Sequence, residues 1–385
     1  MAGHSAVATL TLANATSGAR LTIPAASVPP EALLELPKAE LALTDRFARF
    51  ALMASANAVA DAGLDWTAQD PSRCGVASGS CMNGITETEV GFEALFVRGR
   101  SRVHPFTLVR TMPNAPAACV AMRFELAGPT LHYSTTCSSS SVAIGEAART
   151  IRHGYADVMI AGGTESLLTY SAVNCWNSAQ LLARLHDDPA QSCRPFDSTR
   201  DGTVLGEGAV FVVLEDWDRA LARGAPIRAE LAGYACSADS GHLTQPSVAG
   251  QARSMKNALA DAAMPSEAVT YVHAHGTATK LNDAVETQAI KTVFGAHATR
   301  LAISSSKGMV GHMVGASGAM GLVLAVKALE TGQIPPTANL RHPDPACDLD
   351  YVPGSGRDAP NLAAAICNAF GFGGTCATLV VSRPH

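Results

Sequence analysis

The stretch Pro129–Ile151, PTLHYSTTCSSSSVAIGEAARTI, reads as a strand, a turn of small residues and a helix, in that order. Cys137 lies in the turn, so its thiol is expected where a strand gives way to a helix. The free amides and the positive dipole end of a helix N-terminus favour a thiolate over a thiol. Hydrolases hold their nucleophile on the same kind of turn. A single cysteine is more often a small buried apolar residue, so the interpretation of Cys137 as a nucleophile depends on the rest of the chain.

Composition sets the limits of the fold. The 385 residues are 47% hydrophobic and 16% charged, enough for a large core in two units or one duplicated domain. The net charge of −5 argues against nucleic-acid binding. The ten cysteines are scattered without a CxxC pair, as expected for reduced thiols in a cytoplasmic protein, without disulfides or a zinc knuckle. No signal segment and no apolar run of the ~18 residues that span a bilayer is recognised, so no membrane association is expected.

The order of elements repeats along the chain. An alanine-rich helix is expected over residues 45–62, with Thr44 as N-cap and Gly63 after its last turn, followed by a strand over residues 74–79. Residues 251–275 repeat this order, a helix to Ala263 and then a strand from Thr270. The order of helix and strand in the first half of the chain therefore recurs in the second half.

A second repeat connects the Cys137 turn and its helix with the turn at 304–308 and the helix at 318–331. Strands that alternate with helices indicate βαβ crossovers and a mostly parallel sheet. We therefore expect an α/β fold with two sheets packed around a shared helical layer. The expected halves are residues 1–225, which carry the cysteine, and residues 226–385, joined in one compact unit.

Four segments combine residues that suit acyl transfer. They are the Cys137 turn, HAHGTAT (273–279), KGMVGH (307–312) and NAFGFGGT (368–375). A thiolate can accept an acyl group, the amides of a glycine-rich loop can hold an oxyanion, and imidazoles can donate hydrogen bonds or move protons.

The His-x-His pair has a competing interpretation. In a strand, His273 and His275 would face the same way, as two metal ligands do. The chain has no convincing third ligand at the appropriate spacing, so we expect no metal. A metal-dependent hydrolase that uses His273 and His275 stays an alternative.

The chain resembles the elongating β-ketoacyl-[acyl carrier protein] synthases (KAS I/II type) of the thiolase superfamily. The resemblance runs from about Asp45 to the C-terminus. Besides the segments above, it rests on several dense motifs, which are RPFD (194–197), RDG (200–202), GEGA (206–209), AVETQAIK (284–291), GQIPPT (332–337) and DLDYVP (348–353). It implies thiolase-like duplicated βαβαβαββ halves in a five-layer α-β-α-β-α sandwich.

The resemblance also implies a reaction. Cys137 would take an acyl chain from the pantetheine thioester of an acyl carrier protein, and a malonyl carrier protein would then enter. His275 and His312 would assist loss of carbon dioxide and stabilise the enolate, which attacks the acyl-cysteine. The amides of Cys137 and Phe372 would hold the oxyanion, and Phe372 would gate the pocket. No cofactor is implied beyond the phosphopantetheine arm of the carrier protein.

Further roles follow from the same resemblance. Lys307 matches the family lysine near the second histidine. Thr277 and Thr279 match positions that hydrogen-bond the pantetheine arm. Met112 matches a position that lines the acyl pocket near the dimer interface, although plain core filling is the simpler interpretation.

The chain also departs from the family pattern. The first 40 residues lack the usual opening strand with its glycine-containing turn. A glutamate normally pairs with the family lysine from the following helix, but Gly321 stands at that position, so Lys307 must find another partner or have a lowered pKa. His273 and Lys280 replace a more usual Asn and Pro. These differences favour a specialised type II polyketide or polyene pathway over housekeeping fatty-acid synthesis.

Partners and rival functions follow from the family. An acyl carrier protein is the expected partner, and the basic run Arg98–Arg102 is a candidate docking face. We expect a dimer, either with a second copy or with a paralogue. A non-catalytic partner of the chain-length-factor kind is one alternative, although this chain keeps the cysteine and both histidines. A degradative thiolase, which uses coenzyme A and a second cysteine, is another; Cys376 is the nearest candidate, and the two-histidine set weighs against it.

Overall fold

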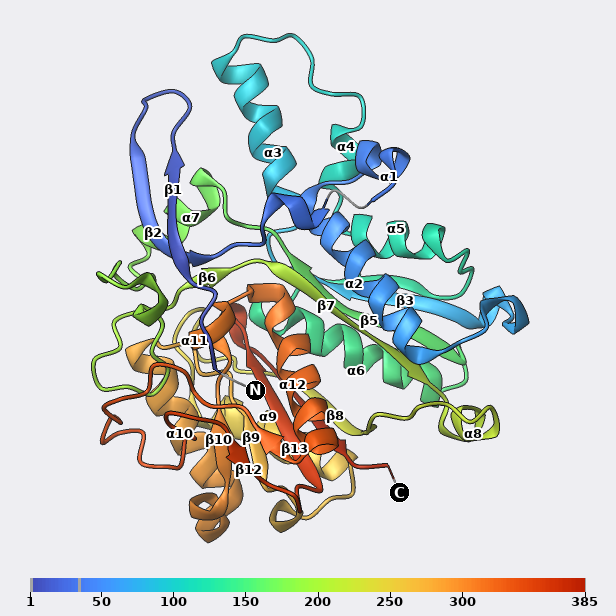
Figure 1. The fold of residues 1–385 in the computed structure, drawn as a ribbon, viewed down its shortest axis with the longest axis vertical. Helices are drawn as coiled ribbons and strands as arrows, with labels where there is room; N and C mark the ends of the chain where they lie inside the picture. The colour runs from blue at the N-terminus through green and yellow to red at the C-terminus, as the bar shows by residue number, and fades with distance from the viewer. Residues whose placement is uncertain (1–2, 34–35, 385) are drawn as a thin grey trace.

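The computed structural model describes residues 3–33 and 36–384, in which strands and helices alternate along most of the chain (Figure 1). The strands are β1 (Ala8–Ala13), β2 (Arg20–Ala26), β3 (Cys74–Gly79), β4 (Thr130–Tyr133), β5 (Val158–Glu165), β6 (Leu205–Gly206), β7 (Gly208–Glu215), β8 (Glu230–Ala238), β9 (Tyr271–His273), β10 (Ala302–Ser304), β11 (Gln333–Ile334), β12 (Arg357–Asp358), β13 (Ala364–Phe370) and β14 (Thr375–Ser382). The α-helices are α1 (Lys38–Leu43), α2 (Arg46–Ala62), α3 (Ile85–Phe92), α4 (Thr107–Thr111), α5 (Ala115–Arg123), α6 (Ser139–Arg152), α7 (Tyr170–Ser178), α8 (Trp217–Ala222), α9 (Val248–Asp261), α10 (Lys280–Phe294), α11 (Lys307–Val310) and α12 (Ser317–Thr331).

Two sheets and three helical layers make up the body of the molecule. The first sheet has the order β4-β3-β5-β7 and the second the order β10-β9-β13-β14-β8. Helices α6 and α12 contact each other and both sheets, so they form the middle layer, which lies at the centre of Figure 1. Helices α2 and α5 pack on the first sheet, and α9, with α10 against it, packs on the second. The five-layer α-β-α-β-α order expected from the sequence is observed.

The two sheets are built alike except at one edge. In each sheet a central strand (β3 or β9) runs parallel to both of its neighbours. The fourth strand of each sheet is antiparallel to the one beside it, β7 to β5 in the first sheet and β14 to β13 in the second. In the second sheet, β8 then pairs antiparallel with β14. Among the described residues the first sheet has no counterpart of β8, so β7 is paired on one side only. The first half therefore has one strand fewer than the βαβαβαββ unit implies.

The N-terminal residues form a different structure. β1 pairs antiparallel with β2 in a hairpin, and β2 continues parallel to β6. Figure 1 shows this hairpin projecting from the side of the molecule. Near the start of β7 a mostly apolar groove opens, lined by Ala6, Phe50 and Met53 among others. Residues 8–26 of this divergent segment thus belong to a small separate sheet with β6, outside the two main sheets.

Most elements lie where the sequence predicts them. The strand at 74–79 and the helix at 46–62 are observed, and Gly63 ends that helix in the left-handed conformation with φ 58°. The prediction of Thr44 as N-cap is wrong. Asp45 is the residue that precedes the helix, while Thr44 ends α1 and donates its hydroxyl to the carbonyl of Glu40.

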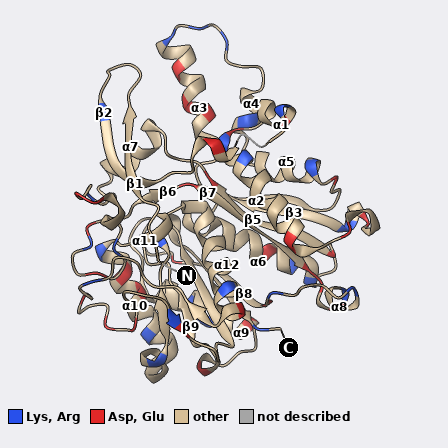
Figure 2. Cartoon of the chain, viewed as in Figure 1, with Lys and Arg blue, Asp and Glu red and all other residues tan. Residues whose placement is uncertain are grey.

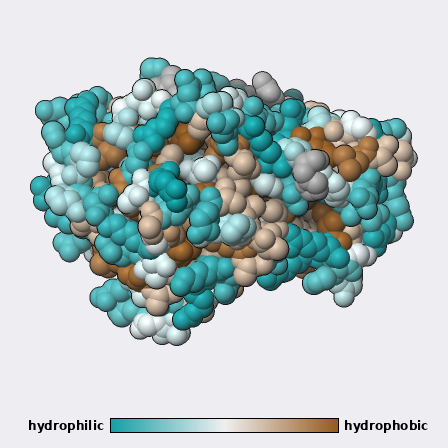
Figure 3. All heavy atoms as spheres, turned by 90° about the horizontal axis from the view of Figure 1, so that it is seen from below, coloured by the Kyte–Doolittle hydropathy of each residue, from teal (hydrophilic) through white to brown (hydrophobic). Residues whose placement is uncertain are grey.

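Helix α12 corrects a second expectation. The segment Val314–Thr331 has the 18 residues and the mean hydropathy, 1.3, of a bilayer-spanning helix, although no such run was expected. In the structure 61% of this segment is buried inside the protein. Ala319, Ala325 and Ala328 are fully buried against the middle of the molecule, so the apolar character of this helix is that of a core element. The face of the molecule seen in Figure 3 is mostly hydrophilic, with apolar side chains between the polar ones.

The contact between α6 and the second sheet leaves no room for a side chain at Gly145. A Cβ there would collide with the ring of Tyr234, which is 2% exposed. We expect Gly145→Val to lower the free energy of unfolding by about 1–3 kcal/mol or more, because a fixed aromatic ring cannot move away. Chemical denaturation measures the change. Gly91→Ala is the control, since its Cβ would meet only ordinary contacts of 3.5 Å, and an equal loss there would contradict the packing argument.

Candidate active site

The turn that carries Cys137 is held in an unusual backbone conformation. Between β4 and α6, residues Thr136–Ser138 form a single 3₁₀ turn (η5), and Thr136 has φ 55°. Positive φ is rare for a β-branched residue and occurs at sites where the surroundings enforce it. The hydroxyl of Ser139 donates to the carbonyl of Thr136, and the hydroxyl of Thr136 donates to the carbonyl of Phe372 at 3.0 Å. The predicted strand–turn–helix junction is therefore observed, with the thiol at the start of a helix.

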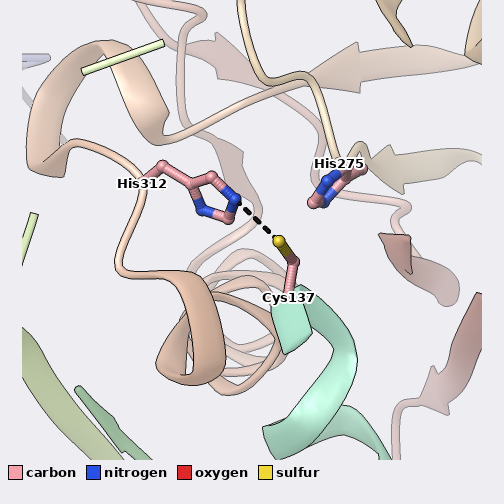
Figure 4. Close-up of side chains that lie close together, drawn as sticks. All are labelled: Cys137, His275 and His312. Carbon is pink, nitrogen blue, oxygen red and sulfur yellow. Dashed lines mark hydrogen bonds between the residues drawn. The ribbon is translucent and has the colours of Figure 1, made fainter. Parts of the chain in front are cut away.

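His312 lies directly against the thiol. Its Nε2 is 3.1 Å from Cys137 Sγ, and its Nδ1 is 2.8 Å from the hydroxyl of Ser317 at the start of α12 (Figure 4). In the tautomer with the proton on Nδ1, Nε2 can accept the thiol proton; in the tautomer with the proton on Nε2, Ser317 donates to Nδ1 and Nε2 can donate a hydrogen bond to a substrate. The edge of the imidazole meets the ring of Trp176 at 6.2 Å between centroids, which fixes its plane.

The thiol is neutral at rest. Burial raises the pKa of Cys137 to about 12, while the charge of Lys307 and the backbone amides of Phe372 and Cys137 act in the opposite direction. The helix start was expected to favour the thiolate; its backbone amides do act in that direction, and burial opposes them with the larger effect. The proton must therefore leave as the nucleophile reacts, and His312 is placed to accept it.

His275 faces the same sulfur from the other side. The two imidazole rings are 5.5 Å apart, edge to face, and Cys137 lies between them in Figure 4. Glu286 positions His275, because its two carboxylate oxygens accept the amides of His275 and Gly276 at 2.8 Å each. Burial, followed by the charge of Lys307, holds the pKa of both rings well below the usual value. Both histidines are therefore neutral and can act as hydrogen-bond donors.

Lys307 lies behind these rings at the first turn of α11. Its ammonium donates to the carbonyl of His275, and the residue as a whole is 4% exposed. Burial lowers the pKa of Lys307, and the carboxylate of Glu286 acts in the opposite direction. The partner that the sequence left open is thus a backbone carbonyl, and the carboxylate of Glu286 is the largest charge that favours the ammonium.

The glycine-rich loop completes the site. Phe372–Gly374 form a short turn (η10), and the amide of Phe372 favours the Cys137 thiolate together with the amide of Cys137 itself. The Phe372 ring is 36% exposed and stacks on Trp176 at 6.1 Å. A side chain at Gly371 would collide with Thr136, so only glycine lets this loop approach the turn.

A pocket with about 820 Å³ of empty space leads to the sulfur. Six of the residues singled out from the sequence line it, namely Cys137, His275, His312, Thr277, Thr279 and Phe372. The two threonine hydroxyls are 2.9 Å apart. Lys307 and Met112 are outside the lining; Met112 packs against Phe47, Ala48 and Ala115 instead. The role of Met112 in an acyl pocket stays a prediction.

The same cluster bears on the metal hypothesis. Among the described residues, Cys137, His275 and His312 form one group whose donor atoms lie within 4.8 Å of one another, a spacing that could also hold a metal ion. His273 is outside this group and contacts Ser306. The structure therefore does not bring His273 and His275 together in one metal site.

Three residues of the site were missed by the sequence analysis. Trp176 packs on both His312 and Phe372. Glu286 lies within a quoted motif, but its role as an acceptor for the His275 turn was not recognised. Glu165 is fully buried and accepts the amides of Cys81, Met82 and Gly315, which joins the two halves beside the sulfur, and burial raises its pKa to about 7. A carboxylate in an apolar strand such as VMIAGGTE was the available signal for Glu165.

Comparisons with known proteins cover most of the chain. The family model described as beta-ketoacyl synthase, N-terminal domain, matches residues 10–220, and the C-terminal domain model matches residues 228–341. The chain is 42% identical over 342 residues to 3-oxoacyl-[acyl-carrier-protein] synthase 2 of Coxiella burnetii, covering 88% of this chain and 82% of that protein. It is 42% identical over 348 residues to nodulation protein E of Rhizobium meliloti, covering 90% of this chain and 85% of that protein.

A solved structure is also similar. It is a type II polyketide synthase acyl-carrier protein in complex with its ketosynthase bound to the hexaketide, AntDE:AntF. The match has a TM-score of 0.83 and 32% sequence identity, and it covers 89% of this chain and 86% of that chain. The thiolase-like fold expected from the sequence is thereby confirmed.

Proposed function

The chain belongs to the β-ketoacyl synthase family, and from this premise we propose that it loads an acyl chain on Cys137 and extends it by decarboxylative condensation with a malonyl carrier protein. It is an acyltransferase that forms carbon–carbon bonds. The observation that carries the proposal is the placement of Cys137 Sγ 3.1 Å from His312 Nε2, with the His275 ring facing the same pocket.

The acylation step uses the neutral thiol. The Cys137 proton moves to His312 as the sulfur attacks the thioester carbonyl of the acyl carrier protein. The carbon–sulfur bond to the enzyme forms, the bond to pantetheine breaks, and the proton leaves with the pantetheine thiol. The amides of Cys137 and Phe372 are suited to hold the oxyanion between these events.

The condensation step uses the two neutral rings. Loss of carbon dioxide from the malonyl group leaves an enolate, whose oxygen would accept hydrogen bonds from His275 and His312. The enolate carbon attacks the acyl-cysteine carbonyl, the new carbon–carbon bond forms, and the Cys137 sulfur is released. Lys307 supports this step because its charge disfavours protonation of either ring.

The pocket and the surface suit a tethered substrate. Thr277 and Thr279 line the same pocket as Cys137, and their hydroxyls are suited to bind a pantetheine arm that enters it. Arg98 begins an exposed loop after α3 that also carries Arg100 and Arg102, and Figure 2 shows it as blue segments at the top of the molecule. The AntDE:AntF complex supports an acyl carrier protein as the partner. We propose this loop as part of its docking face.

A dimer is part of the proposal. The segment from α3 to β4 carries many exposed apolar side chains, and they are Val90, Phe92, Phe96, Val97, Val103, Phe106, Leu108, Val109, Met122 and Leu131. β4 lies at the edge of the first sheet beside them. A patch of this kind marks an interface. We expect light scattering to give twice the mass of the chain, and Leu108→Glu to shift it toward the monomer; a monomeric parent protein would contradict the expectation.

The relatives of the chain act in different kinds of pathway. The relatives include a fatty-acid-type synthase and a nodulation protein, and the structural neighbour is a polyketide ketosynthase. We propose a specialised type II polyketide or fatty-acid pathway in the cytoplasm, with no cofactor besides the carrier-bound phosphopantetheine.

Intact-mass spectrometry after incubation with a panel of acyl carrier proteins tests the function. An adduct of the acyl mass on Cys137 is expected, and its absence from folded protein would contradict the proposal. Absence of the adduct would favour a non-catalytic partner of the chain-length-factor kind. Metal analysis runs alongside, and a stoichiometric transition metal that turnover requires would favour the hydrolase alternative at the Cys137 cluster.

A further inference from the structure

Two departures from the family pattern meet in the structure. Gly321 lies in α12 and His273 in β9. A Cβ built on Gly321 would lie 2.6 Å from His273 Nδ1 and 3.1 Å from Cε1. His273 is 2% exposed, so its ring has no solvent-filled space to move into. The ring therefore occupies the room that any side chain at position 321 would need.

The His273 ring is fastened next to Lys307. Its Nε2 is 3.2 Å from the hydroxyl of Ser306, the residue that directly precedes Lys307. Burial, and after it the charge of Lys307, lower the pKa of His273 to about 3, so the ring is neutral. An uncharged ring thus fills the space beside Gly321, the position at which the family carries the glutamate that pairs with the lysine.

Lys307 has no acidic side chain close to its ammonium among the described residues. Its ammonium donates to the carbonyl of His275, and among the described residues no carboxylate forms an ion pair with it within 4 Å. Glu286 acts on it from farther away and is already occupied by two backbone amides. The ammonium can therefore act on the rings of His275 and His312 without being neutralised by a neighbouring carboxylate.

We propose that His273 and Gly321 are two linked differences from the family pattern, in which the neutral His273 ring replaces an acidic partner of Lys307. Through its contact with Ser306, the ring positions Lys307 behind the reacting sulfur. His273 is a positioning residue, since it is outside the lining of the pocket and acts through Lys307. The inference deepens the proposed function, because the step that Lys307 supports is the decarboxylation assigned there.

The steric part is tested by a double-mutant cycle. We expect Gly321→Glu to lower the melting temperature strongly, because its Cβ meets the His273 ring, and we expect His273→Asn to restore most of that loss when the two are combined. Gly318→Ala is the matched control on the same helix, since its Cβ would meet Ser141 instead. If His273→Asn does not rescue Gly321→Glu, or rescues Gly318→Ala equally, the linkage is wrong.

The positioning part is tested by kinetics. His273→Phe keeps the bulk but removes the contact with Ser306, and we expect it to lower kcat for malonyl decarboxylation about tenfold with KM unchanged. A change in KM alone, or no change in kcat in a folded variant, would overturn the positioning role. The two arms separate from the proposed function, because rescue of melting temperature is observable even in a parent protein that fails to decarboxylate malonyl carrier protein.

Discussion

Cys137→Ala is expected to abolish acyl loading and to lower condensation by on the order of 10⁴-fold or more, the scale of losing a covalent nucleophile. The physical reason is that the two imidazoles then face a methyl group and no sulfur is left to hold the chain. Intact-mass spectrometry measures the loading, and product analysis measures the condensation. Retention of an acyl adduct at another residue would refute the assignment.

Two further variants sharpen this result. Cys137→Gln is expected to leave an enzyme that decarboxylates malonyl carrier protein but does not condense, because the rings of His275 and His312 stay neutral and the side-chain amide fills the place of the thioester. Cys376→Ala is the matched control, since Cys376 also lines the pocket but has no hydrogen bond to either ring. Loss of activity in the control would favour the thiolase alternative, in which a second cysteine acts as a base.

His275→Ala is the second large effect. We expect malonyl decarboxylation to fall by about 10²–10⁴-fold, the usual contribution of a positioned proton donor. Acyl loading should continue, because the proton of Cys137 goes to His312 and not to His275. Separate assays of release of carbon dioxide and of the acyl adduct measure the two steps.

The control for this variant is His242→Ala, which changes an imidazole in the outer lining of the same pocket. It should leave both steps within a few-fold of the parent. Should His275→Ala stop loading as completely as decarboxylation, the division of labour between the two rings would have to be abandoned.

The parts of the fold that the sequence predicts are those that depend on local pattern. Apolar periodicity and a small-residue turn are enough to place Cys137 between β4 and α6, and the repeat of helix and strand is enough to give two sheets. The local hairpin of β1 with β2 was not recognised from the sequence, and the pairing that continues it joins β2 to β6, about 180 residues later in the chain. Register between such distant segments leaves no local trace.

The chemistry of the site divides in the same way. Residue types identified the cysteine and the histidines, but the protonation state of the thiol depends on burial, which only the packed structure gives. Glu165 and Glu286 bind backbone amides, so no matching side chain in the sequence indicates their role. The contact between His273 and Gly321 joins residues of two different elements, and in the sequence they are two separate differences from the family pattern.

The unpaired side of β7 has a practical consequence. Within residues 3–33 and 36–384 no strand pairs with this side of β7, and such an edge pairs readily with an extended segment. Ala6 and Ala209 of β7 line the same groove. An affinity tag or fusion partner that contains an extended segment is therefore best kept away from this edge of the sheet. The carboxyl end follows β14, which has partners on both sides, so that end is the safer place to attach one.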